Sequence, residues 1–520
     1  ASRGAQVAML VAVGVGIVLA LVFVAKNLRT RIVLAGALIA PVVFFGGIIA
    51  LKASPLLKKF PYAFQRMATI YFDKPTARTR LISLQVSWEA FKERPILGWG
   101  QENFKAGYSK HFDPEHLTYE QAWFDRAHNK VAEVAVQNGA IGLARYLTIF
   151  VLGFLGMVRL LKWQSSVSEQ LLAVGVVMLG TAYFVQNLFL FDMPMSYVLF
   201  FSSLAFAGFL MSGGQTIRVN KGKEPVSLRW KKIATGRRLL LFAGGILALY
   251  TLVWANWIPY KTAELGRERL EAKDPSQALA MYNKAMESGG FPKTEVTRAI
   301  METMMSSKRT GTSEWTNVFM RVSGDAESVL AEEYPNLQLL IMLGKLYNER
   351  SFIEPHYFSN AERVLQKAIA LSPTRPEAYY ELGVTHLQRG EGVKGLLFFR
   401  DALALNKMNS RAHWVLGLAL ASQKHAEEGL SELETALAAG YDWDNSIDIN
   451  NLTTVYTSMN LNDRLARFYE QVVARHPTNA QYRAILATTY AKIGAPVKAK
   501  EQVLKAVQLD KRYEQNAAQF

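Results

Sequence analysis

The sequence predicts an all-α protein in which a polytopic membrane helix bundle, residues 1–258, is followed by an α-solenoid of paired helices, residues 259–520. Three observations lead to this prediction. Long apolar runs are concentrated in the first half of the 520-residue chain. After residue 258 the pattern changes to amphipathic helices. In that second part small and large residues recur with a period of about 34 residues.

Six apolar segments are long enough to cross a bilayer, which takes about 20 residues of helix. They lie at approximately 7–25, 32–51, 141–161, 171–191, 194–211 and 239–258. A signal peptide is the alternative for the first segment. Its apolar run from Val7 to Ala25 is longer than a usual signal core, and a second segment follows at once, so we expect a membrane span.

Basic residues fill three of the loops between these segments. They are Lys26, Arg29 and Arg31; Arg159 and Lys162; and the cluster between Arg218 and Arg238. The positive-inside rule places these loops in the cytoplasm. Alternation of the spans then places Arg3, a large loop at 52–140 and the solenoid on the extracytoplasmic side.

Composition excludes several classes of site. The chain has no cysteine, so it has no disulfide framework, thiolate nucleophile or Cys-based zinc site. A net charge of +16 would suit nucleic acid. Much of the excess flanks the spans, however, where topology and anionic lipid account for it, so we expect no nucleic-acid partner. The loop at 52–140 is itself basic, and an anionic ligand is one explanation.

An amphipathic helix is predicted within this large loop. Its apolar residues recur three and four positions apart, at Leu81, Leu84, Trp88 and Phe91. Arg80 is expected at its start, and Pro95, Gly98 and Gly100 end it in a turn-rich segment. A second helix is expected to open near Ala127 and to run into the third span, with His128 and Asn129 in its first turn.

The ordered set of motifs around this loop resembles the O-antigen ligase and polymerase family. The motifs are Arg80, Trp88, Arg94-Pro95-Ile96-Leu97-Gly98-Trp99-Gly100, Asn103-Phe104, Ala127-His128-Asn129 and Gly139-Ala140-Ile141-Gly142. The resemblance covers roughly residues 1–212. It implies a bacterial inner-membrane glycosyltransferase that takes glycan from an undecaprenyl-diphosphate lipid. It also implies that Ser2-Arg3-Gly4 opens an internal span and that the family's N-terminal part is missing from this chain.

The resemblance implies that His128 is the essential base or acceptor-orienting group. A neutral imidazole can take the proton from an acceptor hydroxyl that attacks an anomeric carbon. Asp125 lies three residues earlier and could orient the ring, and Asn129 completes the motif. A lone histidine near a helix start is otherwise more often structural, because imidazole titrates near neutrality in any site.

Three arginines are candidates for binding the lipid diphosphate. The resemblance favours Arg3 and Arg80, and proximity to His128 suggests Arg126. Guanidinium groups bind phosphate in bidentate fashion and stay charged, so they can stabilise a leaving diphosphate without a metal. The alternative is an interfacial cation satisfied by lipid headgroups. No metal and no cofactor are predicted, because the loop lacks an Asp-x-Asp pair in a metal-binding setting, although Asp113 with Glu115 could hold a cation.

Two further features of the loop have alternative explanations. Gly98-Trp99-Gly100 lacks the strand and helix start of a nucleotide-binding loop, so a tight turn is expected. The aromatic residues could stack on sugars or anchor the loop at the membrane interface. They are Trp99, Phe104, Tyr108, Trp123 and Phe124.

The second half resembles the tetratricopeptide repeat. Leu382-Gly383, Gly395, Phe399 and Ala402 recur as Leu416-Gly417, Gly429, Leu433 and Ala436, with a further copy at Leu486 and looser ones at Leu265, Leu343 and Leu452. The segment 290–340 fits the pattern poorly. Stacked helix pairs of this kind form a solenoid with a binding surface, so a protein partner or acceptor is expected there.

These observations favour a metal-independent membrane glycosyltransferase of cell-envelope or lipopolysaccharide biosynthesis, with lipid A core, a growing glycan or a protein as acceptor. The main alternative is a membrane-anchored repeat scaffold without enzymatic activity. A transporter is a third possibility, but no charged residue lies in the middle of a predicted span, where a coupling ion would need one.

Overall fold

The computed structural model describes residues 3–50, 75–163, 166–190, 194–211, 274–287, 293–306, 313–332 and 336–514, together with residues 246 and 250. These residues form helices joined by turns, and no strand occurs among them, which confirms the predicted all-α class. By packing, the chain divides into two units. The first holds residues 1–357 and 366–375, and the second holds residues 358–365 and 376–520.

Apolar helices form one part of the first unit. They are α1 (Arg3–Leu19), α2 (Leu28–Ala50), the second half of α7 (Lys130–Trp163), α8 (Val167–Asn187) and α9 (Pro194–Met211). A π-helix, Ala20–Val24, extends α1. In the described part of the chain, Gly4–Val24, Lys130–Lys162 and Val167–Asn187 are long and apolar enough to cross a membrane.

The predicted spans coincide closely with these helices. Those at 7–25, 141–161 and 171–191 fall on α1, α7 and α8, and those at 32–51 and 194–211 fall on α2 and α9. The sixth, at 239–258, lies outside the described residues apart from 246 and 250.

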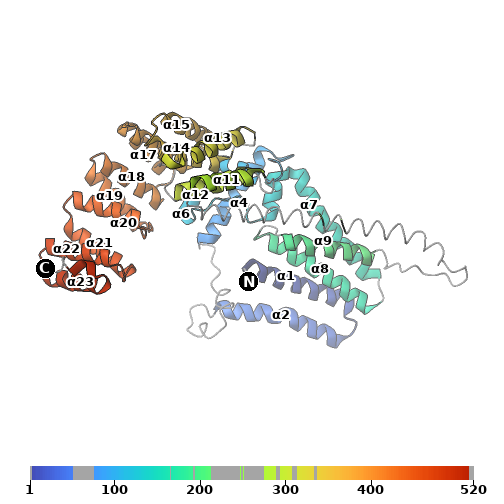
Figure 1. The fold of residues 1–520 in the computed structure, drawn as a ribbon. Coiled ribbons are helices and arrows are strands. Elements are labelled where there is room, and N and C mark those ends of the chain that lie inside the picture. The colour runs from blue at the N-terminus through green and yellow to red at the C-terminus, as the bar shows by residue number, and fades with distance from the viewer. Residues whose placement is uncertain are drawn as a thin grey trace, which may run out of the picture. The chain divides into compact units, whose positions relative to one another are not determined.

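The apolar helices pack side by side, as Figure 1 shows for α1, α8 and α9. Their shared core contains Leu19, Met157, Leu161, Ala173, Val177 and Ala207. Away from this core they expose other apolar side chains, such as Leu152 and Leu155. A helix surface that is apolar on its outside as well as its inside is typical of a membrane helix.

Short helices form a separate loop domain between α2 and the second half of α7. They are α4 (Pro75–Glu93), α5 (Phe104–Lys110) and α6 (His116–Tyr119), and the first turns of α7 pack with them. Their core is rich in aromatic residues and contains Ile82, Val86, Trp99, Phe104, Tyr108, Phe112, Phe124 and Val136. This domain carries most of the predicted site residues.

Amphipathic helices complete the first unit. They are α11 (Pro275–Glu287), α12 (Lys293–Ser306), α13 (Thr316–Glu332) and α14 (Leu337–Ser351), with a 3₁₀ turn at Ser313–Trp315. The helix α15 (Tyr357–Leu371) is divided, because its residues 358–365 belong to the second unit. The segment that fitted the repeat pattern poorly, 290–340, is therefore helical where it is described. Of the looser repeat copies, the one that opens at Leu343 lies on α14 and α15, whereas Leu265 lies outside the described residues.

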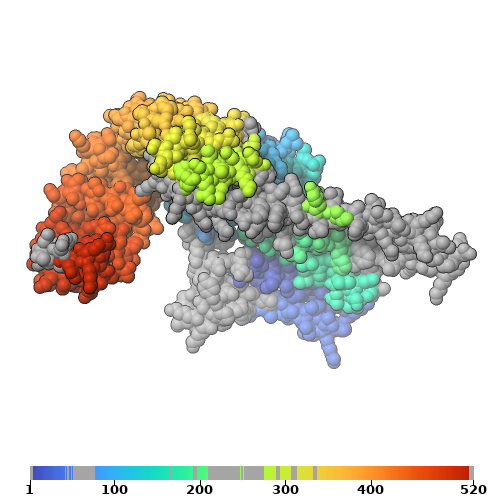
Figure 2. Space-filling model, in the orientation of Figure 1, coloured from blue at the N-terminus to red at the C-terminus, as the bar shows by residue number. Residues whose placement is uncertain are grey.

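The second unit consists of helix pairs, as the repeat predicts. They are α16 (Pro376–Gln388), α17 (Gly392–Leu405), α18 (Ser410–Ser422), α19 (Ala426–Ala438), α20 (Ser446–Ser458), α21 (Asn462–Arg475), α22 (Ala480–Lys492) and α23 (Pro496–Leu509), followed by a 3₁₀ turn at Lys511–Tyr513. Figure 2 shows them, coloured orange to red, as one continuous body.

Small residues and side-chain caps explain the regularity of these pairs. Gly417 and Gly429 bring α18 and α19 so close that a Cβ atom at Gly417 would lie 2.8 Å from the Gly429 carbonyl oxygen. The side chains of Asn409, Asn445 and Asn479 accept hydrogen bonds from backbone N–H groups at the starts of α18, α20 and α22.

Candidate functional site

Two backbone segments, 95–100 and 136–141, hold the loop domain together. The N–H groups of Trp99 and Gly100 donate to the carbonyls of Val136 and Gln137 at 2.9 and 2.8 Å, and the N–H of Ala140 donates to the carbonyl of Pro95 at 2.7 Å. The loop after α4 is thereby tied to the point where α7 passes from the loop domain into its apolar half.

Gly139 makes this close approach possible. It interrupts α7 with φ 62° and ψ −166°, and a Cβ atom there would lie 2.2 Å from the Ile96 carbonyl oxygen. A Cβ atom at Gly98, where φ is 72°, would lie 2.5 Å from the carbonyl oxygen of Gln137. Only glycine fits such positions without strain. The glycines of the two motifs are therefore explained by the fold, and the turn expected at Gly98-Trp99-Gly100 is confirmed.

The second helix begins later than the sequence predicted. It starts at Lys130, so His128 and Asn129 precede it, and the expectation that they lie in its first turn was wrong. The helix begins at Lys130 because the side chain of Asn129 caps its first turn. The Asn129 Oδ1 accepts the Ala132 N–H at 3.0 Å, which makes Asn129 the residue before the helix. The backbone of His128 adopts the left-handed conformation, with φ 51°.

His128 lies beside the aromatic core of the loop domain. It is half-buried, and its ring centroid is 5.0 Å from that of Phe124. Asp125, expected to orient the imidazole, is exposed, and the imidazole packs against the ring of Phe124. Ala127 is buried, and its carbonyl accepts the Ser83 hydroxyl at 3.5 Å. His128 is thus held between a buried residue and a helix cap.

Four segments from distant parts of the first unit meet near His128. Ser83 brings α4 to the backbone just before His128. Asn129 donates through Nδ2 to the Leu188 carbonyl at the end of α8, at 3.2 Å. Gly4, at the start of α1, packs so closely on Phe189 that a Cβ atom there would lie 2.8 Å from the Phe189 Cβ. Arg3, the first residue of α1, therefore lies near this junction, although its side chain is outside the described residues.

Arg80 lies in the second turn of α4, because the helix begins at Pro75 rather than at Arg80. The face of α4 that packs inward carries small and branched residues: Thr79, Ile82, Ser83, Val86, Ser87 and Ala90. The predicted apolar face points away from the core, with Leu81 and Trp88 47% and 57% exposed. Arg80 shares that outer face with Leu84 and Trp88, four and eight residues on, and it has no ion-pair partner among the described residues.

Arg126, by contrast, is engaged by carboxylates. Its guanidinium donates to Glu133 at 3.2 Å and to Glu102 at 3.1 Å, and Lys130 also donates to Glu133, at 2.8 Å. Glu133 is completely buried. Glu133 and Lys130 were not predicted as part of the site, although their spacing of three residues at a helix start is a visible signal. These two carboxylates balance the two cations. Of the candidate arginines whose side chains the structure describes, Arg80 is the one on an exposed surface without an ion-pair partner among the described residues.

Most of the aromatic side chains offered for sugar stacking form the core instead. Trp99, Phe104, Tyr108 and Phe124 are buried, and the Trp99 Nε1 donates to the Ala90 carbonyl at 2.9 Å. Burial raises the pKa of Tyr108 well above its ordinary value, so this hydroxyl stays protonated. Sugar stacking, one of the two alternatives for the aromatic residues, is therefore wrong for these four rings, because they are buried in the core.

Trp123, the fifth aromatic residue, is covered from an unexpected direction. The guanidinium of Arg375, in the turn after α15, lies 3.3 Å from the Trp123 ring centroid and 4.3 Å from that of Phe112. The Thr374 hydroxyl donates to the Phe112 carbonyl at 2.5 Å. Arg375 is itself buried. No periodic pattern connects residues so far apart in the sequence, so this contact was not predicted.

An apolar cavity of about 460 Å³ lies between α7, α8 and α9. Its lining includes Leu147, Phe150, Phe184, Phe200 and Leu204. A cavity with this lining accepts hydrocarbon rather than a polar group.

Residues 1–147 match the family model described as O-antigen ligase, which confirms the predicted resemblance over these residues. The match indicates a function of O-antigen ligase or polymerase type, which is a glycosyltransferase class of enzyme associated with membranes.

The chain is also similar to proteins of other kinds. A curated relative, the E3 ubiquitin-protein ligase CHIP of Arabidopsis thaliana, is 35% identical over 83 residues, which is 16% of this chain and only 30% of that protein. The solved structure of YrrB, a TPR protein with an unusual peptide-binding site, is 18% identical and covers 38% of this chain and 98% of that one, with a TM-score of 0.29. PilW, a type IV pilus biogenesis factor, is 13% identical and covers 44% and 97%, with a TM-score of 0.33.

Proposed function

We propose that this chain is an integral-membrane glycosyltransferase that transfers glycan from an undecaprenyl-diphosphate lipid to an acceptor hydroxyl. The observation that carries the proposal is the meeting of α1, α4, the start of α7 and the end of α8 around His128, within the part of the chain that matches the O-antigen ligase family. A scaffold needs only apolar anchors and has no use for such a junction.

The outer face of α4 supports a position at the membrane surface. Trp88 and Leu81 are exposed, as are Ile96 and Leu97 in the following loop, at 64% and 73%. Tryptophan and long aliphatic side chains prefer the interface between lipid and water. Arg80 on the same face would then lie at the depth of lipid phosphates, where a guanidinium binds a diphosphate in bidentate fashion. Arg3, near the same junction, would be the second cation.

The transfer step needs a base and a stabilised leaving group. The unprotonated nitrogen of His128 would take the proton of the acceptor hydroxyl while that oxygen forms a bond to the anomeric carbon. The bond from the anomeric carbon to the diphosphate oxygen breaks, and the lipid diphosphate leaves with the electron pair. Arg80 and Arg3 stabilise the added charge, and no metal takes part.

Other residues of the site would act by positioning. Arg126 would hold the helix start through Glu102 and Glu133 rather than bind the diphosphate, and Asn129 would fix the backbone of His128 against α8. The cavity between α7, α8 and α9 would take part of the polyprenyl chain. We place the loop domain and the repeats on the extracytoplasmic side of a bacterial inner membrane, as the charges of the loops suggest.

The test is glycan transfer in membranes with variants that keep the fold. His128→Asn suits the left-handed conformation, because asparagine tolerates it, yet removes the base. We expect transfer to fall by a factor of about 10² to 10⁴. Arg80→Ala removes an exposed side chain and is expected to weaken both transfer and binding of the lipid donor. Arg78→Ala is the matched control, since Arg78 is exposed and paired with Glu115.

Unchanged transfer in both His128→Asn and Arg80→Ala would leave the scaffold as the better explanation. In that case the membrane helices would serve as an anchor, and binding of protein partners to the repeats would be the function to measure. Loss of transfer in Arg78→Ala to the same degree would show that the assay reports folding of the loop domain rather than chemistry.

A further inference from the structure

The repeat spacing changes at one point in the second unit. The first helices of the four pairs, α16, α18, α20 and α22, begin at residues 376, 410, 446 and 480, so successive starts are 34, 36 and 34 residues apart. The two additional residues lie in the connection between α19 and α20, which reads Ala439-Gly440-Tyr441-Asp442-Trp443-Asp444-Asn445. Gly440 turns the chain there with φ 81°.

This longer connection is held in one conformation. The buried carboxylate of Asp448 accepts hydrogen bonds from the Tyr441 hydroxyl at 3.0 Å, the Asn445 amide at 2.7 Å and the Trp414 indole at 3.1 Å. The Tyr441 ring stacks on Trp414 with centroids 4.5 Å apart. A connection fixed in this way is preorganised, so its side chains can bind a ligand without first being ordered.

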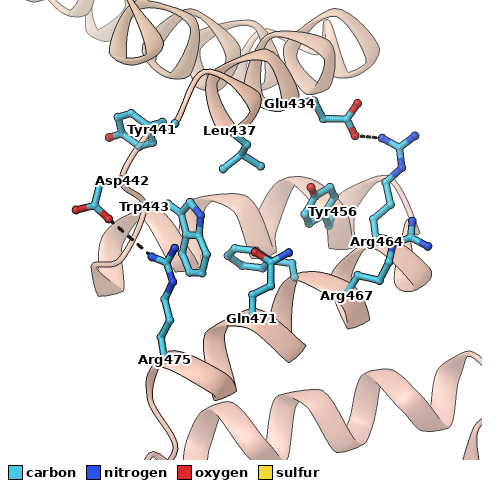
Figure 3. Close-up of a pocket in the computed structure, with 12 residues that line it drawn as sticks. Glu434, Leu437, Tyr441, Asp442, Trp443, Tyr456, Arg464, Arg467, Gln471 and Arg475 are labelled. Carbon is cyan, nitrogen blue, oxygen red and sulfur yellow. Dashed lines mark hydrogen bonds and ion pairs between the residues drawn. The ribbon is translucent and has the colours of Figure 1, made fainter. Parts of the chain in front are cut away.

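A groove of about 820 Å³ opens between this connection, α19 and α21 (Figure 3). Its centre is apolar, where Leu437, Trp443 and Tyr456 face it. Arginines lie at both ends of the groove, with Arg475 at one end and Arg464 and Arg467 at the other. Gln471 lies between them on α21. The four polar residues are three and four positions apart, so they form one row along that helix.

The arginines are open to a further anion. Arg467 is exposed and forms no hydrogen bond or ion pair with another described residue. Arg475 lies over the Trp443 ring at 4.2 Å, and its guanidinium is 3.8 Å from the carboxylate of Asp442 and 3.9 Å from that of Asp444. Both contacts are long, and the Asp442 side chain is 86% exposed. Arg464 pairs with Glu434, and both side chains are more than 40% exposed. Exposed pairs of this kind are weak and exchange easily with a ligand carboxylate.

We propose that this groove binds an extended acidic peptide segment of a partner protein, with an apolar residue between two acidic ones. Arg467 and Arg475 are eight residues apart on α21, which is about 12 Å along the helix. In an extended chain, side chains two residues apart point the same way, and residues four apart are about 13 Å apart. The peptide therefore presents acidic, apolar and acidic side chains at alternate positions, which meet Arg467, the apolar centre and Arg475.

The lining favours a peptide over an anionic glycan. Sugar rings bind to open aromatic faces, but the face of Trp443 is covered by Arg475 and that of Tyr441 by Trp414. The apolar centre would also leave sugar hydroxyls without partners, whereas a leucine side chain needs none.

The experiment measures binding of a fluorescein-labelled peptide with the core Glu-Ser-Leu-Ser-Glu to the full chain in detergent, by fluorescence anisotropy. It needs no transfer activity, so its result is independent of the proposed function. We expect saturable binding that weakens with salt and that falls about tenfold or more in Arg467→Ala, because one charge-assisted contact is lost. Arg400→Ala, an exposed arginine of α17 paired with Glu428, is the matched control and is expected to bind normally.

Charge reversal provides a second measurement. Arg467→Glu should lose the acidic peptide and gain affinity for a peptide with lysine in place of the first glutamate, a result that a misfolded variant cannot give. The proposal is overturned if the peptide with glutamine in place of both glutamates binds equally well, or if Arg467→Ala has no effect. It is also overturned if polygalacturonate binds in an Arg467-dependent manner and the peptide does not, since the groove would then take an acidic glycan.

Discussion

Replacing Arg375 with alanine tests how the loop domain is kept in place. The Arg375 side chain is buried, and its guanidinium lies against the rings of Trp123 and Phe112. A cation held over an aromatic ring in a site shielded from water contributes about 2 kcal/mol. Two such contacts share one cation and do not add fully, so we expect a loss of about 3 kcal/mol in Arg375→Ala. Arg375→Lys keeps the charge but not the planar stacking, and should lose about half as much.

Hydrogen exchange of the full chain in detergent is the suitable assay, because it reports opening of one region separately from unfolding of the whole. A loss of about 3 kcal/mol corresponds to an increase of about 150-fold in the exchange of protected amides. We expect this increase in the segment 104–124 and in the first turns of α7, with the helices α20 to α23 unchanged. Arg400→Ala, which removes an exposed ion pair with Glu428, is the control and should have no effect there.

The reasoning is refuted if exchange in 104–124 stays at its original rate in Arg375→Ala. It is also refuted if Arg375→Lys behaves like the original protein, because then the charge alone, and not the stacking between two rings, would hold the segment. If protection falls equally throughout the chain in both variants, Arg375 supports the fold as a whole and the local contact is not what matters.

Three further predictions concern the loop domain. Gly139→Ala should lower the free energy of unfolding by about 3 kcal/mol or more, because its Cβ would overlap the Ile96 carbonyl at a positive φ, whereas Gly175→Ala on α8, where nothing lies within 4 Å, should be neutral in thermal unfolding. Glu133→Gln leaves two cations around a buried neutral amide and should lower the free energy of unfolding by about 3 kcal/mol in the same assay. Glu89→Gln, which breaks the solvent-accessible pair with Lys92, should lower it by about 0.5 kcal/mol. A hydrogen bond from Lys110 lowers the pKa of Glu93. This pair therefore stabilises the fold above the ordinary carboxyl pKa, and its contribution is lost as the pH falls through the lowered value. The melting temperature should drop more steeply below about pH 5 in the original protein than in Glu93→Gln.

The membrane helices and the repeat pairs were predictable because one physical rule decides each. A backbone in hydrocarbon must satisfy its hydrogen bonds internally, so a long apolar run is read as a helix whatever surrounds it. A repeat that cannot bury its apolar face alone must stack on its neighbours, so the period gives the architecture. The additional two residues between α18 and α20 are also visible in the spacing of Leu416 and Leu452, but what they build depends on Asp448, which the pattern does not show.

The loop domain was harder to predict because packing, not propensity, decides it. Periodicity found the helix α4, but its inward face is the one with Ser83, Ser87 and Ala90, since small side chains let α4 approach the backbone at Ala127. The aromatic residues resembled a sugar platform in the sequence, yet a domain of this size needs them for its core. Arg375 contacts Trp123 although it lies 252 positions later in the sequence, and no local signal connects the two residues.

The residues of the family motif can be divided by whether the fold explains them. Gly98 and Gly139 are required by backbone contact, Trp99 fills the core, and Asn129 caps α7 and reaches α8. Arg80 and His128 have no such explanation. Arg80 is an exposed cation on an apolar face, and His128 keeps a left-handed backbone that glycine would adopt at a lower free energy. Because the fold does not account for these two side chains and both belong to the first unit's family-matching part, the chemistry proposed above is placed on them.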